Sequence, residues 1–105
     1  MPFTDVSWES PESALAAAEF CAVCLIDLNK SGADKIKANC KLPIRSTPGG
    51  PFNRNALRNA AARIFQMVDV PPDEKRKAAS RLVGLMKEAK IVVGSDALLR
   101  LAGKR

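Results

Sequence analysis

Two amphipathic segments, residues 53–68 and 72–90, constrain the fold of this chain more than any other feature of its sequence. In the first segment, apolar side chains recur at the i, i+4, i+7 and i+8 spacing that places them on one helical face. These residues are Leu57, Ala61, Ile64, Phe65 and Val68. The apolar face of the second segment consists of Ala78, Ala79, Leu82, Val83, Met86 and Ala89. Because only a short turn containing Pro71 joins the segments, each face is the nearest cover for the other, which predicts a helical hairpin. Its seam should join Leu57, Ile64 and Val68 to Leu82, Val83 and Met86.

Residues that favour helix ends mark the limits of these segments. Asn53 is a favourable N-cap for the first helix, which we expect to run to about Val68. Pro72 suits the first turn of the second helix, which should end near Lys90. An extended stretch is expected over residues 91–93, and Ser95 then caps a last short helix that ends at Gly103.

The N-terminal half predicts a short helix followed by a β-hairpin. Ser10, Pro11 and Glu12 form a helix start, and this helix should continue to about Ala18. Residues 20–26 are continuously apolar, whereas residues 35–42 alternate between apolar and polar side chains, as a half-buried strand requires. We therefore expect the two runs to pair as strands across a long connection that contains turn formers.

The predicted class is α+β, mainly α, with the helical hairpin packed against a short β-hairpin and flanking short helices. Residues 45–51, RSTPGGP, should form a surface loop because proline and glycine resist regular structure. A chain of 105 residues, 47% of them apolar, suits one domain, which we place at residues 10–105 after an N-terminal arm of residues 1–9.

The net charge and the hydropathy pattern limit the classes of partner that this chain can have. Seventeen Lys and Arg against eleven Asp and Glu leave a net charge of +6, which favours anionic partners but also keeps a small protein soluble. No segment approaches the roughly 20 apolar residues that span a bilayer, and the N-terminus lacks the pattern of a signal peptide. We expect a protein that is not secreted and does not bind membranes.

The sequence argues against catalysis. It contains no His and no Tyr, so the usual general base is missing and a Ser-His or Cys-His nucleophile cannot be assembled. The carboxylates of Asp73 and Glu74 are explained by the start of a helix, and Glu88 lies among lysines. We therefore expect no catalytic residues, no enzymatic activity and no cofactor.

Three cysteines, Cys21, Cys24 and Cys40, are the candidate metal ligands. The C-x-x-C spacing of the first two is half of a zinc site, but a fourth ligand is lacking. If residues 20–26 form a strand, Cys21 and Cys24 point to opposite faces, which excludes both a zinc site and a redox pair. An odd number of cysteines without a secretory context favours reduced structural thiols in a reducing compartment and argues against a disulfide.

Two groups of residues are candidates for binding. In the arm, Phe3, Val6 and Trp8 could reach a partner protein, although folding back onto the core is the commoner fate of such an arm. On the helices, basic side chains could neutralise phosphates or could simply be solvated. This second group consists of Arg54, Arg58, Lys75, Arg76, Arg81, Lys87 and Lys90.

Four segments resemble a small domain encoded in the head-assembly regions of tailed phages, where it occurs alone or attached to prohead proteases and capsid-related proteins. The segments are VCLID at 23–27, CKLPIR at 40–45, PGGPFNRNALRNAAARI at 48–64 and PPDEKRKAASRLVGLMKEAKI at 71–91. The most distinctive pieces are Lys41-Leu42-Pro43 and the Asn-Arg-x-Ala-Leu start of the central helix. This chain departs from the family where Ile44 and Arg45 follow Lys-Leu-Pro, a position that is often His-like there. The resemblance implies a role in the virion or in head assembly, and it carries over no catalytic residue.

Two main hypotheses follow from the sequence, beside a third, a zinc-stabilised interaction domain, which fails if the purified chain carries no zinc and tolerates a chelator without unfolding. The first is a non-enzymatic phage structural or head-assembly protein, located in the virion or the cytoplasm of the bacterial host. It would bind a capsid or related protein, and the chain could also form a homo-oligomer. The second is a basic module that binds nucleic acid or has a regulatory role through its helix faces. Salt dependence separates the two, because phosphate binding weakens steeply as salt rises.

Overall fold

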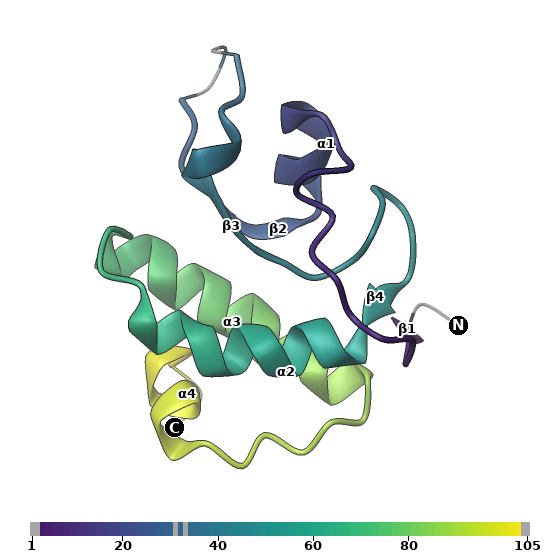
Figure 1. Cartoon of the computed structure of the whole chain (residues 1–105). Helices are drawn as coiled ribbons and strands as arrows, with labels where there is room; N and C mark the ends of the chain where they lie inside the picture. The colour runs from purple at the N-terminus through teal and green to yellow at the C-terminus, as the bar shows by residue number, and fades with distance from the viewer. Residues whose placement is uncertain (1–2, 31, 33, 104–105) are drawn as a thin grey trace.

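The computed structural model describes residues 3–30, 32 and 34–103, and its fold is α+β, mainly α. A β-hairpin crosses one face of a pair of helices, and a short C-terminal helix lies on the opposite face (Figure 1). Within the described residues, no helix has the length and apolar character needed to cross a membrane. The first two residues of the predicted arm lie outside the described part of the chain.

The helical pair predicted from the sequence is present and lies at the centre of the main core. Helix α2 spans Arg54–Arg63 and continues as the 3-10 turn η2, Ile64–Gln66, and helix α3 spans Pro72–Glu88. Leu57 and Ile64 are fully buried in one cluster with Leu82 and Val83, which confirms most of the predicted seam. All six predicted apolar residues of the second helix are buried, as their periodicity indicated.

The prediction fails where α2 ends early. The α-helix stops at Arg63 and tightens into η2, so the side chains beyond Ile64 leave the buried face. Val68 is 95% exposed and Phe65 is 45% exposed, and neither closes the seam. Val70, after the turn, is buried in the core instead. The prediction that the helix continues to Val68 with Phe65 and Val68 on its buried face is therefore wrong.

Caps explain the ends of the helices. The Asn53 side chain accepts a hydrogen bond from the Ala56 N–H at 3.0 Å, as predicted for an N-cap. Helix α3 begins at Pro72 and ends in a Schellman arrangement, with Lys90 at a φ of +62° and the Ile91 N–H bonded to the Met86 carbonyl at 2.8 Å. Residues 91–95 lie outside helices and strands. Helix α4, Asp96–Leu101, has the predicted Ser95 cap and buries Leu98.

A β-hairpin forms as expected, but both of its strands are shorter than predicted. Strand β2, Cys24–Asp27, pairs antiparallel with β3, Cys40–Pro43. The predicted helix over residues 10–18 is wrong, because Pro11 is followed only by turns and helix α1 spans Ala17–Ala22. Phe20 and Cys21 are therefore helical. The first residues of the apolar run therefore belong to helix α1 and not to strand β2.

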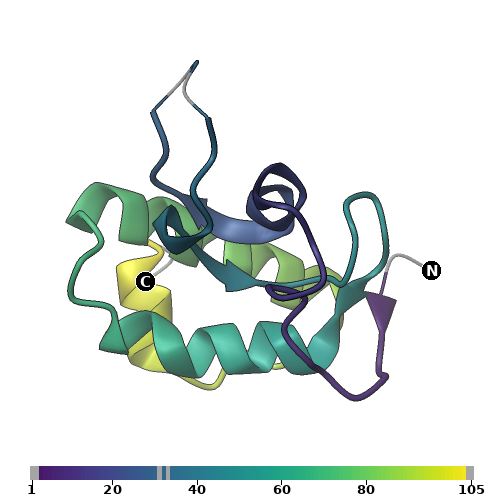
Figure 2. The same cartoon turned by 45° about the horizontal axis from the view of Figure 1, so that its top comes forward.

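The second strand starts later than predicted because the Asn29 side chain forms hydrogen bonds with both backbone groups of Ile36. The Asn29 amide oxygen accepts from the Ile36 N–H at 2.9 Å, and its nitrogen donates to the Ile36 carbonyl at 3.3 Å. These are the groups that a strand partner would use. The next residues form the 3-10 turn η1, Lys37–Asn39, and strand pairing begins at Cys40. The long connection between the strands projects from the rest of the fold (Figure 2).

The N-terminal arm folds back onto the core. Strand β1, Phe3–Thr4, pairs in parallel with β4, Phe52–Asn53, next to the start of α2. The ring centroids of Phe3 and Phe52 are 6.0 Å apart, and the buried Asn53 donates to the Val6 carbonyl at 2.9 Å. In the loop over residues 45–51, ahead of β4, most residues are exposed, as predicted, and residues 46–50 lie in turns and bends. Arg45, at its start, forms an isolated antiparallel bridge with Phe52.

Candidate functional site

A pocket of about 520 Å³ lies where the arm, the β-hairpin and α2 meet. Trp8 of the arm lines this pocket together with Ser10 and Glu12, which directly follow the arm. The 3-10 turn η1 and strand β3 contribute residues 37, 38 and 40–43. The remaining wall is mainly one face of α2, from Ala56 to Arg63. The pocket therefore exists only because segments far apart in the sequence lie side by side.

The innermost lining of the pocket is apolar. Phe20, Leu42, Ala56 and Ala60 line it and are each at most 4% exposed. The two alanines leave space where larger side chains of α2 would fill it. Leu42 has a φ of +61°, a left-handed conformation that costs a non-glycine residue roughly 1 to 2 kcal/mol. Backbone strain of this kind is concentrated at functional sites, which supports β3 as part of a binding site.

The outer lining carries more positive than negative charge. Lys37 donates to the backbone carbonyl of Glu12 at 2.5 Å, so its ammonium is held at the edge of the pocket. Lys41 forms an ion pair of 3.3 Å with Asp69, and its hydrogen bond lowers the pKa of that carboxyl group. Arg63 is exposed and forms no ion pair with any residue that the structure describes. Among the described lining residues, Glu12 is the single carboxylate.

Of the three arm residues predicted to bind a partner, only Trp8 lies at the pocket. Its side chain is half-buried and lines the pocket wall. Phe3 packs against Phe52 and lies 5.5 Å below the Arg54 guanidinium, so it belongs to the arm's own attachment. Val6 is 61% exposed and lies outside the pocket. The arm is therefore bound to its own chain, which was the commoner of the two fates considered.

The predicted anion-binding residues divide into engaged and free side chains. Arg54 pairs with Asp5 at 2.9 Å and donates to the Ala89 carbonyl, which ties the arm to the end of α3. Lys75 donates to the Met67 carbonyl, and Arg76 pairs with Asp73 one turn earlier. Arg58 is exposed and donates to Asn55.

Three residues of this group remain available in solvent. Arg81, Lys87 and Lys90 are exposed, and none forms an ion pair within the described part of the chain. Lys87 and Lys90 border a shallower hollow of about 480 Å³ with apolar residues of the segment before α4. The structure thus reduces the predicted basic face to fewer free cations than the sequence indicated.

The expectation of three reduced cysteines is wrong. Cys21 and Cys40 form a disulfide that joins α1 to β3, with a Cα–Cα distance of 5.3 Å. Sequence reasoning rejected a disulfide because the number of cysteines is odd and a secretory context is lacking. It also placed Cys21 in a strand, whereas the residue lies in a helix that packs on β3. The bond connects two walls of the pocket, since Cys40 and the neighbouring Phe20 both line it.

Cys24 is the remaining thiol and is buried in β2. Burial, aided by the negative charges of Glu12 and Asp27, raises the pKa of this thiol to about 12. A thiol of this kind holds very little thiolate at neutral pH, and the thiolate is the nucleophilic form. Of the three candidate metal ligands, the structure therefore brings Cys21 and Cys40 together and sets Cys24 apart.

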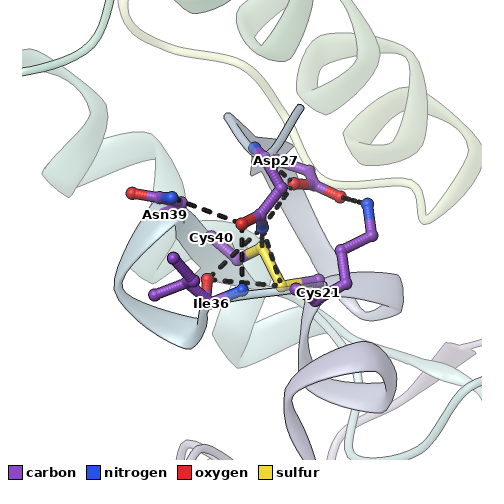
Figure 3. The surroundings of a disulfide bond; sticks show 7 residues. Cys21, Asp27, Ile36, Asn39 and Cys40 are labelled. Carbon is purple, nitrogen blue, oxygen red and sulfur yellow. Dashed lines mark hydrogen bonds and ion pairs between the residues drawn. A yellow bond between two sulfur atoms is a disulfide. The ribbon is translucent and has the colours of Figure 1, made fainter. Parts of the chain in front are cut away.

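A polar cluster surrounds the disulfide (Figure 3). The Asn29 side-chain nitrogen lies 3.5 Å from the Cys21 sulfur, 3.2 Å from the Cys40 sulfur and 2.8 Å from Asp27 Oδ1. Lys35 forms an ion pair of 2.6 Å with the other oxygen of Asp27. Although partial burial acts to raise it, the hydrogen bonds from Lys35 and Asn29 hold the pKa of Asp27 below its ordinary value.

Comparisons of this chain with protein-family models, with curated proteins and with solved structures find no match.

Proposed function

We propose that the protein is a non-enzymatic binding protein of phage head assembly, whose partner is a capsid or related head protein. Its binding site, in this proposal, is the pocket under the N-terminal arm. The observation that carries the proposal is the origin of the pocket walls. Lys41, Leu42 and Pro43 on one side, and Ala56 and Ala60 on the other, belong to the segments that resemble the head-assembly domain.

The chemistry of the pocket favours binding over catalysis. An apolar interior can hold one large apolar side chain, and the Lys37, Lys41 and Arg63 cations at its edge suit acidic residues beside it. General acid–base catalysis most often uses a histidine or a pair of carboxylates, and the described lining offers no imidazole and no second carboxylate beside Glu12. The proposed ligand is therefore an acidic segment of a partner protein with an apolar anchor.

Charge reversal within one helix tests this proposal. Arg63 lines the pocket, whereas Arg58 is exposed on the same helix outside it, so Arg63→Glu and Arg58→Glu form a matched pair. Each tagged protein is used to capture partners from cells that assemble phage heads, and the captured proteins are quantified by mass spectrometry. We expect a head protein with the wild type and with Arg58→Glu, and at least about a tenfold loss with Arg63→Glu, equivalent to 1.4 kcal/mol.

Two outcomes contradict the proposal. One is the absence of any head protein among the proteins captured by the wild type. The other is an equal loss of the head protein with both charge reversals, because that result assigns binding to general charge and not to the pocket.

A second function, binding of nucleic acid through the helix faces, is favoured by one observation. Arg81, Lys87 and Lys90 are exposed cations without ion pairs among the described residues, in a chain with a net charge of +6. Phosphate contacts release counterions, so the affinity for a fluorescent oligonucleotide would fall steeply as salt rises. Each cation that contacts a phosphate contributes about one unit to the slope of log affinity against log salt. A slope near zero, unchanged in Lys87→Glu, excludes this function.

A further inference from the structure

We propose that Cys21, Cys40 and Asp27 form a site for a thiophilic divalent cation, with Zn²⁺ as the natural occupant, when the disulfide is reduced. The two sulfur atoms and a carboxylate oxygen of Asp27 all lie within 4.8 Å of one another. The three residues come from α1, β3 and the end of β2, and Figure 3 shows their side chains in one polar cluster.

The spacing suits one tetrahedral ion. Zinc binds thiolate sulfur at about 2.3 Å and carboxylate oxygen at about 2.0 to 2.2 Å, so its ligands lie roughly 3.5 to 4 Å apart. Two sulfurs released from a covalent bond reach this separation by side-chain rotation, because their Cα atoms remain 5.3 Å apart. Asp27 supplies the third ligand, and water takes the fourth position.

A polar side chain already bridges the three ligands. The Asn29 side-chain nitrogen lies 2.8 to 3.5 Å from Asp27 Oδ1 and the two sulfurs, which share its two hydrogens. It must therefore shift when an ion takes the place between the ligands, and it can then donate to them from outside the metal. Donors around thiolates and carboxylates set the direction of the ligands and stabilise their negative charge. Because Cys21 and Cys40 are buried, the two sulfurs are also shielded from bulk water.

The disulfide and the metal exclude each other. A dithiol reductant would break the Cys21–Cys40 bond by thiol exchange, transferring two electrons and two protons and becoming a disulfide itself. Zn²⁺ would then displace the two thiol protons and bind both thiolates. Either state joins α1 to β3, so Phe20 and Leu42 both stay in the pocket wall under oxidising and reducing conditions alike.

Lys35 opposes the metal as well. Its ammonium lies 2.6 Å from Asp27 Oδ2 and must move away before that carboxylate binds a cation. The Lys35 side chain is 38% exposed, so it can leave without disrupting the core. Lys35→Met should therefore strengthen metal binding.

Titration of the purified full-length chain with Co²⁺, a spectroscopic substitute for Zn²⁺, tests the site. The protein reduced with an excess of a phosphine should bind one Co²⁺ per chain and gain a thiolate-to-cobalt absorption band in the near ultraviolet. The oxidised protein should show neither. Asp27→Asn should weaken binding by at least about tenfold.

Two controls match the ligand variants. Asp34→Asn changes a carboxylate in the same connection outside the cluster, and Cys24→Ser removes the thiol that is set apart; both should bind like the wild type. The site is disproved if the reduced wild type gains no thiolate band, or if Asp27→Asn binds as tightly as Asp34→Asn. Since the readout needs no partner protein, its failure is distinct from failure of the proposed head-assembly function.

Discussion

At the scale of single residues, Asn53 has the most consequential position in the described chain. It is 1% exposed and makes two contacts of different kinds. Its oxygen caps α2 by accepting from the Ala56 N–H, and its nitrogen holds the arm by donating to the Val6 carbonyl. One buried amide thus links the start of the central helix to the segment that carries Trp8.

Asn53→Ala should lower the free energy of unfolding by about 2 kcal/mol, roughly half from the lost N-cap and half from the lost hydrogen bond. Urea unfolding measures this change. Since Trp8 is the only tryptophan, its emission should also shift to longer wavelength as the arm loosens. Asn59→Ala, at an exposed position of the same helix, should change stability by less than about 0.5 kcal/mol. An unchanged Trp8 emission in Asn53→Ala would contradict the role given to this amide.

A second prediction at the scale of single residues concerns the ionisation of the Cys24 thiol. Its thiol pKa rises from 9.0 to about 12, a difference of about three units, so near pH 8 it holds about 1,000-fold less thiolate than an ordinary cysteine. Alkylation by iodoacetamide should therefore be slow in the native protein and rapid in urea, measured by mass spectrometry. Because the folded pKa lies above the unfolded one, stability is retained below pH 9 and falls as the pH rises toward 12. Rapid native alkylation at pH 8 would show that the thiol is not buried as described.

At the scale of the elements, the ends of helices and strands depend on side chains that no periodicity reveals. The Asn29 amide delays β3 by bonding both backbone groups of Ile36. Lys90 ends α3 in a left-handed conformation, where glycine is the usual residue. The first feature determines where a strand begins and the second where a helix ends, and neither changes the type of the element.

Lys90→Gly should raise the free energy of unfolding by about 0.5 to 1 kcal/mol. Glycine relieves the roughly 1 to 2 kcal/mol cost of the left-handed conformation, and part of this gain is offset by the greater entropy of glycine in the unfolded chain. Lys90→Ala keeps the strained conformation and should give no gain. Thermal unfolding of the two variants beside the wild type measures the difference, and equal stability of Lys90→Gly and Lys90→Ala would disprove the explanation.

At the scale of the whole molecule, the disulfide joins the smaller core cluster around α1 to the β-hairpin. Cys21 and Cys40 are 19 residues apart, and a crosslink over a loop of this length stabilises a small protein by about 3 kcal/mol through the unfolded state. Reduction in a metal-free buffer should therefore lower the urea midpoint of the wild type. Cys24→Ala should remain equally sensitive to reductant, whereas Cys21→Ala/Cys40→Ala should be insensitive. A wild type that unfolds at the same urea concentration with and without reductant would contradict the crosslink.

The sequence by itself determined the helical pair, the caps at Asn53 and Ser95, the buried face of α3 and the presence of a β-hairpin. These features depend on residues within a few positions of one another, so spacing and local propensity suffice to predict them. The same local reasoning placed Val68 in the core and Phe20 in a strand, because it could not see a helix tighten into η2 or α1 start late.

Only the tertiary structure decided the pocket, the Cys21–Cys40 bond and the docked arm. Each of them joins backbone segments that are distant in the sequence, and the contacts exist only after the helices and the hairpin pack together. A cysteine or a lysine shows its residue type in the sequence, but its neighbours are set by how the chain folds. For that reason, the candidate sites of this protein depend on tertiary packing, whereas its helices and its hairpin follow largely from the periodicity of the sequence.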